Sequence, residues 1–264
     1  RYNAVCPSEL WGRLIAYLAN MIGTALHQAC YRLIESVREK KERIAMLNMD
    51  FQKRLVLETQ DIPWQESPAA GVMRKPLERS APESGHVTSI VQYEKGASFN
   101  EHPHPMGEEI FVLEGVFSDE NGDYPKGSYL RHPPGSTHAP FSKEGCVIFV
   151  KLNQFNEQDD QFVRIDTRAT QWLPGMGGLQ VMPLHEYQHE HVALVKWPAK
   201  EVFQKHRHFG GEEILVLSGE FCDEHGRYPT NTWIRSPHLS EHHPFVDQET
   251  VILVKTGHLP LVSE

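Results

Sequence analysis

Side chains that can bind a metal ion occur twice in this chain with identical spacing. The first set is His102, His104, Glu108 and His138, and the second is His206, His208, Glu212 and His242, each residue displaced by 104 positions. Three imidazoles and one carboxylate form a donor set suited to Zn²⁺, Fe²⁺, Mn²⁺, Ni²⁺ or Cu²⁺, whereas Ca²⁺ and Mg²⁺ prefer oxygen ligands alone. The spacing therefore predicts two sites, each for one divalent transition metal ion.

Other residues could compete for these roles. Side chains alternate along a strand, so His-x-His places both imidazoles on one face, and the carboxylates of Glu109 and Glu213 should point away from it. His243 stands beside His242 but aligns with Ala139, so the repeat selects His242. The cluster of His185, His189 and His191 has no counterpart in the first copy, and we interpret it as a polar edge or loop rather than a third metal site.

The segment between the ligands is also duplicated. Residues 108–141 and 212–245 are identical at 18 of 34 positions. Short runs rich in Val, Ile, Phe and Tyr are separated by Gly, Pro, Asn and Asp, which predicts an antiparallel sandwich or barrel. Before them, residues 1–46 show apolar residues at helical spacing. We predict an all-β fold with two domains, 49–158 and 159–264, preceded by a short α-helical segment at 1–48.

Composition excludes several classes of protein. The 264 residues carry a net charge of −9, with a pI near 6.0, which argues against a direct nucleic-acid partner or an anionic membrane surface. The longest apolar stretch, residues 14–26, is interrupted by Asn20 and Gly23 and is too short to span a bilayer. The four cysteines form no Cys-x2-Cys pair, which indicates a reducing, cytoplasmic location.

Both ligand sets lie in motifs that resemble those of cupins. The first copy matches Gly96-x5-His102-x-His104-x3-Glu108-x6-Gly115 and Gly127-x5-Pro133-x-Gly135-x2-His138, and departs only at Ser142, where the motif ends in Asn. The second copy keeps all four ligands but carries Lys200, Asn231 and Leu239 where the motif has glycines. The resemblance implies two double-stranded β-helix (cupin jelly-roll) domains in tandem. For the second site, the resemblance therefore predicts which residues are ligands, whereas the missing glycines leave the geometry of the surrounding turns open.

More narrowly, residues 102–141 resemble the cupin domain of the ChrR anti-sigma factors. That resemblance implies a zinc ion on His102, His104, Glu108 and His138, and a sigma factor or another regulatory protein as partner. In that family, the sigma factor is bound by a separate N-terminal helical zinc domain, whose zinc motif is His-x3-Cys-x2-Cys. The present N-terminus offers only His27-x2-Cys30. The cupin part therefore carries the resemblance.

Three functions are compatible with these residues and motifs. The first is a zinc-dependent, stress-sensing regulator, related to anti-sigma factors, that acts through a protein partner and could form a homodimer. The second is a mononuclear non-haem dioxygenase that uses iron and a small chelating carbonyl substrate. Its substrate would lie beside the metal, among inward-facing residues such as Phe99, Ile110, Phe141, Phe203 and Phe245. The third is a silent bicupin in which the metals only stabilise the fold.

Overall fold

The computed structural model describes residues 46–81 and 83–261. The chain divides into two units, residues 1–46 and residues 47–264. The second unit is nearly all β and contains two tandem cupin domains, as the sequence predicts. The predicted α-helical segment falls almost entirely outside the described residues. No helix in the described part of the chain is long and apolar enough to cross a membrane.

The first large sheet has eight strands. Its order is β11-β8-β6-β10-β4-β3-β2, and β7 pairs with β6. The strands are β2 (Gln65–Glu66), β3 (Val72–Arg79), β4 (Val87–Tyr93), β6 (Glu108–Asp119), β7 (Gly122–Pro125), β8 (Ser128–His132), β10 (Cys146–Leu152) and β11 (Val163–Asp166). A short 3₁₀ helix, η1 (Thr59–Asp61), precedes β2.

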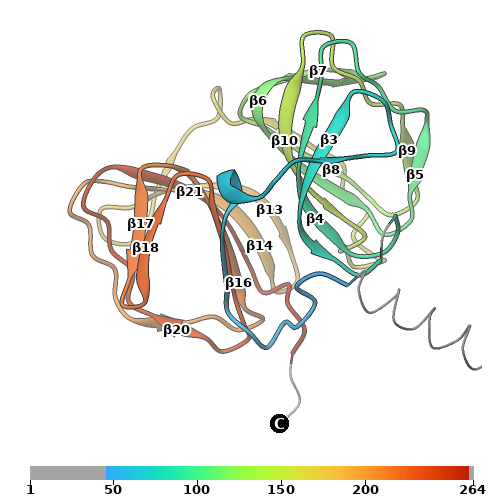
Figure 1. Cartoon of the computed structure of the whole chain (residues 1–264). Coiled ribbons are helices and arrows are strands. Elements are labelled where there is room, and N and C mark those ends of the chain that lie inside the picture. The colour runs from blue at the N-terminus through green and yellow to red at the C-terminus, as the bar shows by residue number, and fades with distance from the viewer. Residues whose placement is uncertain (1–45, 82, 262–264) are drawn as a thin grey trace, which may run out of the picture. The chain divides into compact units, whose positions relative to one another are not determined.

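The second large sheet repeats this arrangement with seven strands, and Figure 1 shows several of them in orange and red. Its order is β1-β19-β16-β21-β14-β13-β12. The strands are β1 (Leu55–Glu58), β12 (Leu173–Pro174), β13 (Gln180–Tyr187), β14 (Glu190–Trp197), β16 (Glu212–Ser218), β19 (Thr232–Ser236) and β21 (Thr250–Thr256). The short runs rich in Val, Ile, Phe and Tyr that predict strands are found in the strands of these two sheets.

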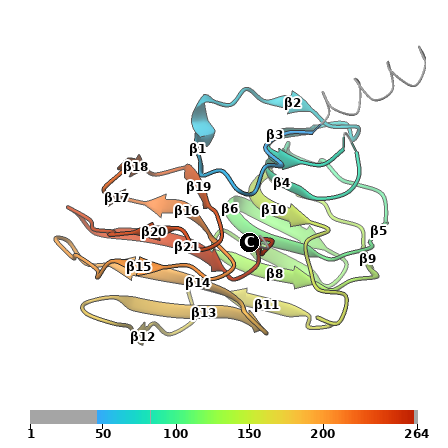
Figure 2. The ribbon, with the colours of Figure 1, turned by 90° about the horizontal axis from the view of Figure 1, so that it is seen from below.

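The two sheets exchange one edge strand. β1 precedes the first domain in sequence but pairs with β19 of the second sheet, from Leu55 opposite Arg235 to Glu58 opposite Thr232. Conversely, β11 follows the predicted boundary at 158/159 but pairs with β8 of the first sheet. Figure 2 shows β1 beside β19 and β11 beside β8. The predicted boundary therefore follows the sequence repeat, whereas each sheet borrows a strand from the other repeat.

Three apolar clusters among the described residues explain why the central strands are buried on both faces. One cluster fills the first domain around Ile110, Val112 and Ile148, and a second fills the other domain around Ile214, Val216 and Ile252. A third cluster joins the two large sheets and contains Phe111, Phe149, Leu215, Trp233 and Leu253. Successive side chains of β6 thus alternate between the domain interior and the contact with the other domain.

Three two-stranded sheets complete the described part of the second unit. β5 (His102–His104) pairs with β9 (Ser136–His138), and β15 (His206–Arg207) pairs with β20 (Glu241–His242). β17 (Glu220–Asp223) pairs with β18 (Gly226–Pro229) across a hairpin turn. The equivalent turn in the first domain joins β6 to β7. Both turns lie at the repeated Asp-Glu-x-Gly segments of the sequence.

The second domain keeps its turns without the motif glycines. Gly135 has a φ of 81°, and Leu239 at the equivalent position has a φ of 61°. Lys200 and Asn231 also adopt positive φ, each at 71°. A residue with a Cβ is strained in this left-handed region, so the second domain maintains these turns at a conformational cost.

Candidate metal centre

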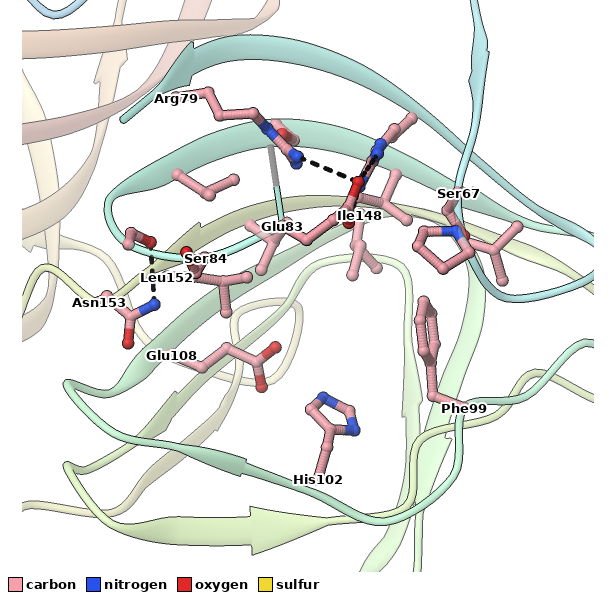
Figure 3. A pocket seen from close by; sticks show the side chains of 18 of the residues that line it. Ser67, Arg79, Glu83, Ser84, Phe99, His102, Glu108, Ile148, Leu152 and Asn153 are labelled. Carbon is pink, nitrogen blue, oxygen red and sulfur yellow. Dashed lines mark hydrogen bonds and ion pairs between the residues drawn. The ribbon is translucent and has the colours of Figure 1, made fainter. Parts of the chain in front are cut away.

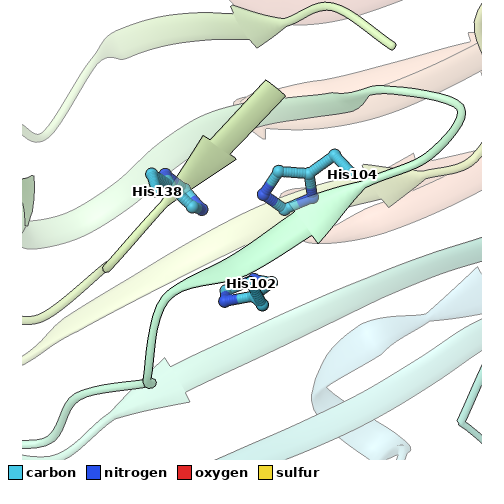
Figure 4. Close-up of side chains that lie close together, drawn as sticks. All are labelled: His102, His104 and His138. Carbon is cyan, nitrogen blue, oxygen red and sulfur yellow. The ribbon is translucent and has the colours of Figure 1, made fainter. Parts of the chain in front are cut away.

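Two short strands bring the three histidines of the first site together. His102 and His104 lie two residues apart on β5, and β9 pairs antiparallel with β5 so that His102 stands opposite His138. Period-2 alternation turns both β5 imidazoles to one side. The ring centroids of His104 and His138 lie 4.7 Å apart, and those of His102 and His138 lie 5.3 Å apart. Figure 4 shows the three rings converging between the two strands.

Glu108 completes this site from the first residue of β6. Its Oε2 lies 3.5 Å from His104 Nε2 and 3.3 Å from His138 Nε2. Burial opposes ionisation of this carboxyl group, but the neighbouring imidazoles of His104 and His138 and a hydrogen bond from His132 lower its pKa to about 2. Glu108 is therefore ionised and ready to bind a cation.

The second site repeats this construction. His206 stands opposite His242 across β15 and β20, and His208 Nε2 lies 3.0 Å from His242 Nε2. Glu212 Oε2 lies 3.5 Å from His208 Nε2 and 3.6 Å from His242 Nε2. Here burial raises the pKa of Glu212 to about 7, and the opposing influence of His242 is smaller. The same four residue types thus produce two electrostatically different sites.

The donor atoms at both sites fit a transition metal ion. His104 Nε2 and His138 Nε2 are buried and have no hydrogen-bond partner. Burial lowers the pKa of His104 to about 4 and that of His208 to about 3, so both imidazoles are neutral at neutral pH and keep a free lone pair. Ligand atoms of the three histidines lie within 4.8 Å of one another in each site. A bound metal ion would give these buried nitrogens the partner they lack.

The competing carboxylates point elsewhere, as strand alternation requires. Glu109 Oε2 lies 2.9 Å from Arg131 Nη1 and 2.6 Å from Lys255 Nζ. Glu213 Oε2 lies 2.6 Å from Lys151 Nζ. These ion pairs occupy the contact between the two domains. His243 is exposed, and its backbone N–H donates to Glu224, so its position differs from that of buried His242.

A carboxylate lies behind one histidine of each site. Asp119 Oδ2 lies 3.7 Å from His138 Nδ1, and Asp223 Oδ2 lies at the same distance from His242 Nδ1. A carboxylate on the Nδ1 side of the ring favours a proton there, which would leave Nε2 free to bind a metal ion. Asp223 also receives a hydrogen bond from Arg54 at 2.9 Å. Because Arg54 precedes the exchanged strand β1, a residue from the first repeat supports the second site.

One buried histidine of the first site was not among the residues that the sequence predicts. His132 is 3% exposed and ends β8, and its Nδ1 lies 2.8 Å from Glu108 Oε2. The second repeat has Ser236 at the equivalent position. Duplication could not reveal His132, because it points only to residues that both copies share.

A cavity of about 270 Å³ opens beside the first site. Its wall is largely apolar and includes Val91, Phe99 and Ile148, and His102 and Glu108 also line it. Figure 3 shows His102 and Glu108 near one end and Arg79 and Glu83 near the other. Of the five inward-facing residues expected around a substrate, Phe99 lines this cavity, whereas Ile110 is fully buried in the apolar cluster of the domain. The cavity could hold a small molecule whose polar end reaches the metal.

The remaining sequence candidates lie apart from both centres. His189 and His191 are exposed around the β13–β14 turn, as predicted for a polar edge. His185, by contrast, is buried in β13, and its Nε2 lies 2.8 Å from Asp159 Oδ2. Cys146 and Cys222 are buried free thiols.

Comparisons with known proteins agree with this architecture. The family model described as ChrR Cupin-like domain matches residues 52–156 and again residues 160–260. A proposed dioxygenase from Nostoc punctiforme aligns with a TM-score of 0.66 and 17% identity, over 80% of this chain and 85% of that chain. Bacterial pirin from Escherichia coli in complex with nickel(II) gives a TM-score of 0.60 and 14% identity, over 80% and 100% of the two chains.

Bacillus subtilis oxalate decarboxylase, which has Mn(II) centres, gives a TM-score of 0.56 and 12% identity, over 79% and 78% of the two chains. At these identities the structural likeness shows the fold alone. A comparison with curated proteins finds no relative that matches the sequence.

Proposed function

Since the chain belongs to the family of ChrR cupin-like domains, we propose that it is a metal-dependent regulator that holds one zinc ion in each domain and acts through a protein partner. One observation carries this proposal: the fold builds the same set of three imidazoles and one carboxylate twice. Four protein ligands can complete a tetrahedral zinc ion, as in structural zinc sites, whereas catalytic zinc sites commonly keep three protein ligands and an open position.

The first metal centre has a route to a stimulus. His102 is only half-buried and lines the cavity, together with Glu108. A small chelating molecule or an oxidant in this cavity would meet metal ligands directly. We propose that such a molecule alters the first centre and thereby the contacts with the partner. A sigma factor is the partner that the family resemblance suggests, and a reducing cytoplasm is the matching location.

Metal analysis tests the foundation of this proposal. Elemental analysis of the purified full chain should find close to two equivalents of zinc. A chain with Glu108→Ala and His138→Ala should keep one equivalent, and so should a chain with Glu212→Ala and His242→Ala. No bound transition metal after mild purification would remove the basis of the assignment.

Capture of a partner tests the regulatory part. The full chain should retain an extracytoplasmic-function sigma factor co-expressed with it, and an oxidant or a chelator should change the amount retained. The chain with Glu108→Ala and His138→Ala should lose this response while the exposed-surface control Lys95→Met keeps it. Equal retention by all three chains under every condition would contradict a role for the first centre in regulation.

The cavity supports a second candidate function, that of a non-haem iron dioxygenase. The apolar wall beside half-buried His102 could hold the body of a small substrate while its carbonyl group reaches the metal. Iron-loaded protein should then consume O₂ in the presence of one member of a panel of 1,3-dicarbonyl compounds. Iron in the purified protein and O₂ uptake would favour the enzyme, whereas zinc and no uptake would favour the regulator.

A further inference from the structure

His132 gives the first domain a group that the second domain lacks. Its side chain is buried in the domain interior at the end of β8, and β8 pairs with β6 so that His132 stands opposite Glu108. Its equivalent, Ser236, stands opposite Glu212 in the same register. The two domains therefore differ in one metal-binding side chain at an otherwise equivalent backbone position.

The arrangement of His132, Glu108 and His138 is that of ligands sharing one ion. Glu108 Oε2 lies 2.8 Å from His132 Nδ1 and 3.3 Å from His138 Nε2. Two ligands bound at about 2.0–2.2 Å to one zinc ion lie roughly 2.8–3.6 Å apart, from octahedral to tetrahedral angles. All three residues are buried, and their ligand atoms lie within 4.8 Å of one another. The three side chains are therefore close enough together to share one metal ion.

We propose that the first domain offers its metal ion a second, inner position formed by Glu108, His132 and His138. This inference rests on the proposed binding of metal at the first centre. Glu108 and His138 belong to both positions, so the two are alternatives for a single ion. In the outer position the ion binds His102 and His104, and in the inner position it exchanges these two ligands for His132.

The inner position has a consequence for the cavity. His102 is half-buried and lines the cavity, whereas His132 is absent from its lining. When the ion occupies the inner position, His104 and the cavity-lining His102 are released without loss of the metal. The first centre could thus respond to a molecule in the cavity while it keeps its metal ion. The second centre has Ser236 in place of His132 and therefore lacks the inner position.

Variants without the outer ligands, His102 and His104, show whether a metal ion can bind at the inner position. The parent chain carries Glu212→Ala and His242→Ala, so that it binds metal at the first centre alone, and the probe is Zn²⁺ or Co²⁺ without another ligand. The parent should bind one equivalent. After His102→Ala and His104→Ala it should still bind close to one equivalent, with a changed Co²⁺ absorption spectrum. The further change His132→Ser should abolish binding.

Each other outcome has a definite meaning. No metal in the parent chain would overturn the proposed function itself. A parent that binds metal, together with a folded His102→Ala, His104→Ala chain that binds none, would overturn the inner position alone. His132 would then only hold Glu108 in place, and His132→Ser in the parent would weaken binding by about 10–100-fold.

If the first-domain variants fail to fold, the inner position can be tested by introducing its histidine into the second domain. A chain with Glu108→Ala and His138→Ala should hold one equivalent of metal, in the second domain. The further changes His206→Ala and His208→Ala should remove this equivalent. Adding Ser236→His should restore binding through Glu212, His242 and the new imidazole. A folded grafted chain that binds no Zn²⁺ or Co²⁺ would overturn the proposal. Circular dichroism verifies the fold of each chain.

Discussion

Lys255 Nζ lies 2.6 Å from Glu109 Oε2, across the contact between the two domains. The equivalent pair in the opposite direction, Lys151 and Glu213, also has a separation of 2.6 Å. Glu109 and Glu213 directly follow the carboxylates Glu108 and Glu212 in sequence. The strand that begins at each metal centre is therefore tied by a buried ion pair to the other domain.

Removing one partner of this pair should strongly destabilise the protein. Lys255→Met leaves Glu109 and Glu190 buried with Arg131 as their remaining close cation among the described residues. We expect a loss of about 3–5 kcal/mol in the free energy of unfolding, measured with urea. The exposed pair Lys95–Glu144 provides the control, because Lys95→Met should cost less than about 1 kcal/mol. Equal losses for both variants would contradict a structural role for the buried pair.

An exchange of glycine and leucine should have opposite effects in the two domains. A Cβ at Gly135 would meet no atom within 4 Å, so Gly135→Leu tests the backbone alone and should cost roughly 1–2 kcal/mol. Leu239 is 43% exposed, and Leu239→Gly should relieve the strain of its positive φ and stabilise the chain by up to about 1 kcal/mol. Urea unfolding measures both changes. Destabilisation of similar size in both variants would show that the Leu239 turn is not strained.

The two metal centres should lose their ions at different pH values. His138 and His242 have similar surroundings: burial opposes protonation, but the nearby Asp119 or Asp223 carboxylate raises the pKa of both. The difference comes from Glu212, whose pKa of about 7 exceeds the value of about 2 for Glu108. Protons therefore compete with metal at Glu212 as the pH falls below 7, whereas Glu108 stays ionised.

Chains that keep a single centre allow this comparison. The chain with Glu108→Ala and His138→Ala should release zinc at higher pH than the chain with Glu212→Ala and His242→Ala. Without metal, the buried neutral Glu212 contributes stability that is present at low pH and lost as the pH rises through about 7. Zinc should therefore raise the melting temperature of the chain that keeps Glu212 more at about pH 8 than at about pH 6. Identical release curves would contradict this electrostatic difference.

The two described thiols should react slowly in the native protein. Burial raises the pKa of both Cys146 and Cys222 to about 11. At neutral pH the thiolate fraction is then about 100-fold lower than for a free cysteine with a pKa near 9. Iodoacetamide labelling, followed by peptide mass mapping, should show slow modification at both positions and fast modification after denaturation. Complete labelling of the native chain within minutes would contradict this prediction.

The sequence by itself predicted the strands, the duplicated cupin fold and eight residues that the structure gathers into two clusters. This was possible because strand alternation and short turns act locally. His-x-His on β5 shares a face whatever surrounds it, and a carboxylate four residues later begins the adjoining strand. The repeat then supplied His138 and His242, which are distant in sequence but equivalent in the two copies.

Only the tertiary structure decided the features that depend on the other domain or on one copy alone. An apolar pattern shows which face of a strand is buried but not which sheet the strand joins, so the exchange of β1 and β11 could not be predicted. Lys255 and Glu109 are 146 residues apart, and no local pattern pairs them. His132 became visible as a neighbour of Glu108 only when β8 was placed beside β6, because burial and distance, and not spacing, make it a potential ligand.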